Sequence, residues 1–168
     1  MRHHLLLLPL VLAACAVAPA APAAGGPPKA SEGIVTHAPD AAMLGRQHWR
    51  LAQATDAHGQ RIDALFVRAD KPLQLDFTQD SLRVSGGCNG MSGNYRVADG
   101  QLQVSAMRHT MMACADPALN RLDGQISSRL EGHPAITVTI RGMAPQLELR
   151  TSSGDVLNFT GVTAPGQP

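Results

Sequence analysis

The chain has 168 residues, 44% of them hydrophobic but only 3% aromatic, and its 14 Lys and Arg residues nearly balance its 13 Asp and Glu residues. This length leaves room for one modest domain. A near-neutral chain with one Trp, one Tyr and three Phe has neither a basic stripe for phosphates nor an aromatic ladder for bases, which argues against a nucleic-acid partner.

Residues 1–14 have the form of a bacterial lipoprotein signal peptide. A short basic start leads into an apolar run, and the Leu-Ala-Ala-Cys that ends it resembles a lipobox. The resemblance implies cleavage before Cys15 and acylation of this residue, so the lipid bilayer is an expected partner. An ordinary secretory signal, cut among the later alanines, is the alternative. Cleavage removes Arg2, which lowers the basic residues from 14 to 13, against 13 acidic residues.

Three further segments follow the signal. Residues 15–40 begin with the lipidated Cys15 and are rich in Ala, Pro and Gly, which predicts a tether without a core of its own. Residues 41–162 are expected to form the folded domain, and residues 163–168 a flexible tail.

Within the domain, apolar and polar residues alternate with the two-residue period of half-buried antiparallel strands. Short turn sequences rich in Asp, Gly and Ser separate these runs, which favours a meander. The alternating apolar positions are Leu73, Leu75, Phe77, Leu82, Val84, Leu102, Val104, Ile136, Val138, Ile140, Leu147, Leu149, Leu157 and Phe159.

One segment, residues 117–131, has helical periodicity instead. Asp116 suits an N-cap and Gly132 a C-terminal stop. The apolar face consists of Leu119, Leu122, Ile126 and Leu130, with Arg121, Asp123, Ser128 and Arg129 assigned to the opposite face. We expect this helix to pack on the sheet, and we attribute Gly124 within it to close packing. The composition is therefore mainly β with one helix, an α+β class.

The stretch SGGCNGMSGNY at residues 85–95 lies between two predicted strands. A phosphate-binding loop would need a following helix and a lysine, and neither is present. The glycines instead favour a bulged turn. Lipidation of Cys15 leaves Cys88 and Cys114 as a pair, which in an oxidising compartment predicts a disulfide that pins this turn. In the loop-entropy treatment such a bridge contributes about 3.5 kcal/mol of stability.

Metal and catalytic sites are weakly supported. Zinc would need Cys88, Cys114 and His109 with His48 or His58, but no short ligand spacing supports this set. Ser92 and His109 belong to no nucleophile motif. We therefore predict no catalytic residue, no metal, no cofactor and no enzyme activity.

Three methionines, Met107, Met111 and Met112, stand just before Cys114. The favoured interpretation is that they fill the core under the helix. A copper(I) site built from thioethers and an adaptable apolar contact surface are the alternatives.

Four segments, GGCNGMSGNY, L-x-V, TMMAC and DPALNRLDGQISSRLEG, together resemble the META domain family, most closely its HslJ-type lipoproteins. The resemblance extends from about residue 49 to residue 159. It implies a small antiparallel sheet, curled toward an open barrel of about seven or eight strands, with one helix packed on it. It also implies a heat-inducible envelope protein linked to novobiocin resistance, with no established enzyme activity or cofactor.

The resemblance implies an architectural role for seven motif residues, Gly87, Cys88, Asn89, Gly93, Thr110, Met112 and Cys114. The family often has arginines at two positions that are Gly90 and Met111 here. An anion-binding role that depends on these paired arginines is therefore not expected.

The first functional hypothesis is a non-catalytic lipoprotein that faces the periplasm from the outer membrane and contacts an unidentified envelope partner under stress. Ala16 after the lipidated cysteine resembles the outer-membrane sorting pattern of enteric bacteria. The second hypothesis is a module that binds a small hydrophobic ligand or a metal on the concave side of the curled sheet. The two differ in whether Met107, Met112 and the helix fill that concavity.

Overall fold

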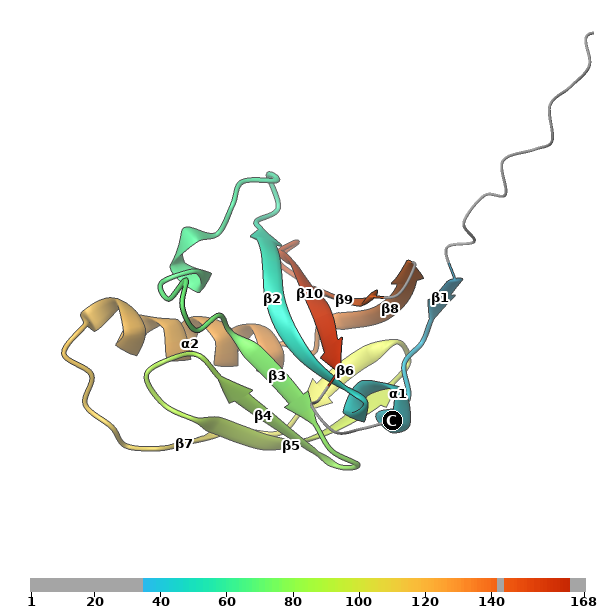
Figure 1. The fold of residues 1–168 in the computed structure, drawn as a ribbon, viewed down its shortest axis with the longest axis horizontal. Helices are drawn as coiled ribbons and strands as arrows, with labels where there is room; N and C mark the ends of the chain where they lie inside the picture. The colour runs from blue at the N-terminus through green and yellow to red at the C-terminus, as the bar shows by residue number, and fades with distance from the viewer. Residues whose placement is uncertain (1–34, 142–143, 164–168) are drawn as a thin grey trace, which may run out of the picture. The chain divides into compact units, whose positions relative to one another are not determined.

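A computed structural model describes residues 35–141 and 144–163, shown in colour in Figure 1. The predicted signal peptide, Cys15, most of the tether and residues 164–168 of the tail lie outside these ranges. Every buried apolar side chain of the core lies between Leu44 and Phe159, and residues 32–168 form a compact unit by themselves. This unit therefore carries its own core. None of the helices in the described ranges has the length and apolar character needed to span a membrane.

Strands are the main secondary structure of the described residues. The strands are β1 (Val35–His37), β2 (Gln47–Thr55), β3 (Gln74–Phe77), β4 (Ser81–Ser85), β5 (Met91–Ala98), β6 (Gln101–Val104), β7 (Arg108–His109), β8 (Ala135–Arg141), β9 (Ala144–Arg150) and β10 (Val156–Thr163). The helices are α1 (Ala41–Gly45), the short 3-10 turn η1 (Asp63–Leu65) and α2 (Pro117–Glu131).

The strands close into a barrel in which all pairings are antiparallel. The order runs β8-β6-β5-β4-β3-β2-β10-β9, and β9 pairs with β8 to close the ring. Two short strands lie outside this ring, β1 on β8 and β7 on β5. The predicted curled barrel of about seven or eight strands with one main helix is confirmed.

The closure of the barrel is uneven. β6 meets β8 through a single residue pair, Gln101 with Ala135. Beyond that pair, β1 occupies the same edge of β8, because β9 covers the other edge along its whole length. The structure thus places a strand at 35–37, within the range that the sequence assigned to the tether.

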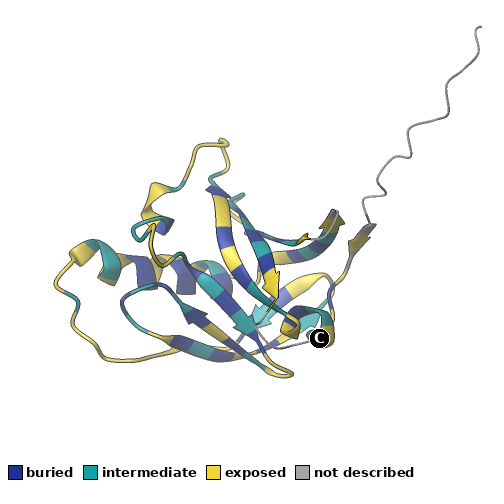
Figure 2. Ribbon diagram, viewed as in Figure 1, coloured by how far each residue is buried: buried dark blue, intermediate teal, exposed yellow. Residues whose placement is uncertain are grey.

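Alternation along the strands puts the apolar residues inside the barrel, as the banded ribbon in Figure 2 shows. Trp49 and Phe159 are fully buried. Helix α2 adds Leu122, Ile126 and Leu130, each at most 2% exposed. Burial of one such side chain is worth roughly 1.5 to 3 kcal/mol. These buried side chains occupy the interior of the barrel, where the second hypothesis placed a ligand site.

The caps of α2 are as predicted, since the Asp116 carboxylate accepts from the Ala118 N–H and Pro117 opens the helix. The explanation of Gly124 was wrong, because a Cβ at this position would meet no atom within 4 Å. By contrast, Gly86 has a φ of +100°, and a Cβ there would lie 2.6 Å from the carbonyl oxygen of Pro72. Only the second glycine is required by its surroundings.

Substitution by alanine should change the free energy of unfolding in opposite directions at these two glycines. Gly86→Ala should lower the free energy of unfolding by about 2 kcal/mol or more, because of the positive φ and the clash with Pro72. Gly124→Ala should raise it by up to about 1 kcal/mol, since alanine is the better helix former. Urea unfolding of both variants measures the difference, and equal effects would contradict this account.

Candidate functional site

The glycine-rich stretch is the turn between β4 and β5, whose strands pair as far as Val84 with Met91. A disulfide joins Cys88 in this turn to Cys114, 26 residues further along the chain. The predicted bridge is confirmed. It consumes both thiols, so neither a reactive thiol nor the zinc ligand set considered from the sequence can form in this state.

The carboxylate of Asp123 on α2 holds the turn in place through hydrogen bonds. This residue is 5% exposed, and its oxygens accept from the backbone N–H of Cys88 at 2.9 Å and of Asn89 at 2.9 Å. The Asn89 side-chain amide donates a third bond at 3.0 Å. A Cβ on Gly87 would lie 2.1 Å from an Asp123 oxygen. The turn can therefore approach the carboxylate only with glycine at position 87.

Asp123 was missed in the sequence, where it was assigned to the polar face of the helix. The signal was available. Asp123 follows Leu119 by four positions and precedes Ile126 by three, which are the spacings of residues on one helical face. A carboxylate on an apolar face needs hydrogen-bond donors, and the turn provides them.

Asn89 connects the turn to the loop that carries Cys114. Its Oδ1 accepts from the Thr110 hydroxyl at 2.9 Å and from the Met112 N–H at 2.8 Å. Thr110 also accepts from the Gly90 N–H at 3.1 Å and donates its own N–H to the Gly90 carbonyl at 3.0 Å. Motif residues from two distant segments thus bond to one another. These bonds join the β4–β5 turn to the loop that carries Cys114.

The three methionines separate. Met107 is 8% exposed and lies in the core, where its N–H donates to Glu131 at 2.7 Å. Met111 is 98% exposed and Met112 is 62% exposed. Core filling is therefore right for Met107 and wrong for the other two. Both residues lie between the end of β7 and the start of α2, in a loop that can be followed in Figure 1.

The other candidate residues do not assemble a reaction centre in the parts of the chain that the structure describes. Ser92 pairs with Arg108 and His109 with Met91 across β5 and β7, and no hydrogen bond joins Ser92 to His109. The Nδ1 of His48 instead forms a hydrogen bond of 2.5 Å with the carboxylate of Asp76, which lies on β3. Within residues 35–141 and 144–163, no three His, Cys, Asp or Glu side chains gather as a metal site would require.

One side chain in the barrel is electrostatically perturbed. Burial raises the pKa of Tyr95, and the negative charges of Asp80 and Asp40 raise it further. Its hydroxyl donates to the Thr78 carbonyl at 2.8 Å. Tyr95 thus stays neutral and serves as a hydrogen-bond donor that fixes the β3–β4 turn.

Comparison with known proteins agrees with this arrangement. Residues 42–163 match the META domain family. The chain belongs to this family. It is also similar to heat shock protein HslJ of Escherichia coli (strain K12), at 33% identity over 87 residues, which are 51% of this chain and 59% of that protein. The match therefore spans less than two thirds of the length of that relative.

A solved structure shows the same fold as this META domain. An NMR structure of a protein from Burkholderia xenovorans has a TM-score of 0.65 and 23% identity, and the match covers 87% of this chain and 99% of that one. A second NMR structure has a TM-score of 0.49 at 23% identity, covering 71% of this chain and 92% of that one.

The network predicts that the charge of Asp123 is required for stability. Asp123→Asn places an amide NH₂ against backbone donors and should lower the free energy of unfolding by about 2 to 3 kcal/mol. Asp116→Asn on the same helix is the matched control, because asparagine caps a helix as well as aspartate. Urea unfolding without reductant measures both, and a similar small effect of the two substitutions would refute the role of Asp123.

Proposed function

We propose that this META domain protein is a non-catalytic lipoprotein of the cell envelope that acts by contact with another envelope component under stress. In this proposal acylated Cys15 anchors it in the outer membrane and the domain faces the periplasm. The lipobox-like sequence before Cys15 supports the anchor, and Ala16 supports the outer-membrane address. Similarity to a protein named as a heat shock protein supports the link to stress.

The observation that carries the proposal is the pair of exposed methionines. The backbone of Met112 is held away from the core, because its N–H donates to Asn89 and the disulfide at Cys114 fixes the loop two residues later. Met111 is 98% exposed beside it. Methionine is a flexible and polarizable side chain suited to adaptable contact surfaces. A fixed loop that presents two of them is therefore the best candidate for the contact.

The proposal assigns no catalytic residue and no cofactor. The side chains of Thr110, Asn89 and Asp123 direct their hydrogen bonds to one another and to backbone. Their hydrogen-bonding capacity is used for holding the loop rather than for a substrate.

The contact predicts a loss of function without a loss of stability. In a strain that lacks the gene, the Met111→Ser, Met112→Ser double variant should fail to restore tolerance to heat or novobiocin. Its free energy of unfolding should change by less than about 0.5 kcal/mol, because the side chains are exposed. Ala113→Ser with Ala115→Ser, both exposed on the same loop, is the control that should restore tolerance. Full rescue by the methionine variant would reject this surface.

The anchor predicts a specific labelling pattern. Wild-type protein should incorporate radioactive palmitate and sediment with the outer membrane, whereas Cys15→Ser should do neither, since lipidation starts at the cysteine sulfur, which serine lacks. Palmitate on the Cys15→Ser variant, or wild-type protein in the inner membrane fraction, would contradict the anchor or its address.

A further inference from the structure

The sulfur atoms of the domain differ widely in their access to solvent. The disulfide uses both cysteines of the described residues, which leaves the methionine thioethers as the oxidisable sulfur groups there. Met111 is 98% exposed and Met112 is 62% exposed. Met91 and Met107 are buried, with exposures of 1% and 8%. An oxidant in solution therefore reaches the first two thioethers more readily than the other two.

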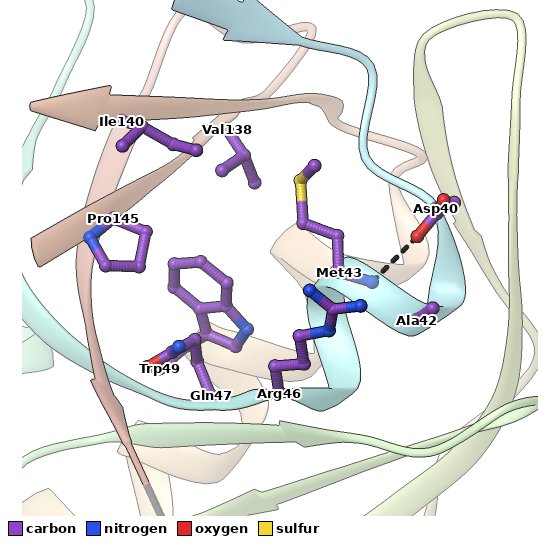
Figure 3. Close-up of a pocket in the computed structure, with 9 residues that line it drawn as sticks. All are labelled: Asp40, Ala42, Met43, Arg46, Gln47, Trp49, Val138, Ile140 and Pro145. Carbon is purple, nitrogen blue, oxygen red and sulfur yellow. Dashed lines mark hydrogen bonds between the residues drawn. The ribbon is translucent and has the colours of Figure 1, made fainter. Parts of the chain in front are cut away.

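A further methionine has an intermediate environment. Met43 of α1 is half-buried and lines a hollow of about 260 Å³ between α1, β2, β8 and β9, together with Trp49 and Val138 (Figure 3). The indole N–H of Trp49 donates to the Leu44 carbonyl at 2.9 Å, which fixes the wall of the hollow. Met43 is thus a partly accessible thioether in the same chain, with which the exposed pair can be compared.

The loop that carries the exposed pair is held through its backbone. The Thr110 N–H donates to the Gly90 carbonyl at 3.0 Å, and the Met112 N–H donates to the Asn89 Oδ1 at 2.8 Å. These bonds lie on both sides of Met111, and neither involves a methionine side chain. A chemical change at either sulfur therefore leaves the bonds that position the loop intact.

The common oxidation product of methionine is the sulfoxide, which is polar. With hypochlorous acid, the sulfur lone pair attacks chlorine and hydroxide leaves, after which water displaces chloride. Overall a sulfur–oxygen bond forms, the sulfur is oxidised, chlorine is reduced to chloride and a proton is released. In the core the new oxygen would be a buried acceptor without a donor, which is costly. At Met111 and Met112 it projects into water, so the oxidised domain stays folded.

We propose that Met111 and Met112 form a reversible oxidation site, at which sulfoxide formation turns an apolar surface into a polar one while the loop keeps its position. The chemistry depends only on the exposure of the two side chains. Its consequence for function rests on the proposed envelope contact, because a polar sulfoxide weakens an apolar contact. Methionine sulfoxide reductases restore the thioether, which makes the change reversible.

A limiting amount of oxidant tests which thioethers react first. The compact unit, residues 32–168, would carry Met143→Leu, since residue 143 lies outside the described ranges. Less than an equivalent of hypochlorous acid is added, and peptide mapping by mass spectrometry locates each gain of about 16 Da. The exposures of Met111 and Met107, 98% and 8%, differ about twelvefold, so about tenfold more sulfoxide should form at Met111. Oxidation of Met43, Met91 or Met107 as fast as Met111 would overturn the proposal.

The change in the surface is measured separately. Oxidation of the exposed pair should shorten the retention of the protein on a hydrophobic-interaction column and leave the midpoint of urea unfolding unchanged. Pre-reduced methionine sulfoxide reductases A and B, added in stoichiometric amounts, should restore the retention, because each enzyme reduces one sulfoxide epimer. Retention that stays short, or a lower unfolding midpoint of the oxidised protein, would contradict a reversible site on an intact fold.

A conservative variant separates this site from general oxidative damage. Met111→Leu, Met112→Leu keeps the surface apolar but removes both sulfur atoms, so the same dose of oxidant should leave its retention unchanged. A shift equal to that of the wild-type residues would refute the site. The outcome is distinct from the cellular test of the contact. Rescue by the serine variant would reject the contact surface and leave the oxidation chemistry standing, whereas a failed sulfoxide map would reject the oxidation site alone.

Discussion

The hydrogen bonds to the buried carboxylate of Asp123 are the interaction on which the glycine-rich motif depends. The described residues place no cationic partner beside it, so its charge is stabilised by N–H donors of the β4–β5 turn. Such charge-assisted bonds are stronger than neutral ones, and removal of one partner leaves an unpaired buried charge. The glycine before Cys88, the asparagine after it and the disulfide position the turn for this contact. The same bonds fix the position of the loop that carries Met111 and Met112.

Much of the fold was predictable from the sequence because the relevant forces act locally. Residues such as Leu75 and Val84 alternate with polar neighbours, and a half-buried strand is the structure in which that pattern buries one face. Asp116 and Pro117 define the start of α2 through bonds within one helical turn. The disulfide also followed from the sequence, since the lipobox predicted at Cys15 leaves only two other cysteines.

The site was less predictable because its contacts join distant segments. The helical spacing of Asp123 placed it on the apolar face, but only the turn 34 and 35 residues earlier explains why a charge is tolerated there. Met111 and Met112 are apolar residues of a type that is common in protein cores. The hydrogen bond from the Met112 N–H to Asn89, which keeps them outside the core, cannot be recognised from the local sequence pattern. The hollow beside Trp49 likewise requires α1, β8 and β9 to meet.

The uneven edge of β8 has a mechanical consequence. β1 is the first described strand of the chain, and it holds β8 through three residue pairs, Val35 to Ile140, Thr36 to Thr139 and His37 to Val138. Tension applied along the N-terminal chain reaches these pairs before any other part of the barrel. β1 can detach without breaking the eight-strand ring, whose own β6–β8 contact lies further along the edge. Loss of these three pairs alone would therefore free β1 and leave the eight-strand ring intact.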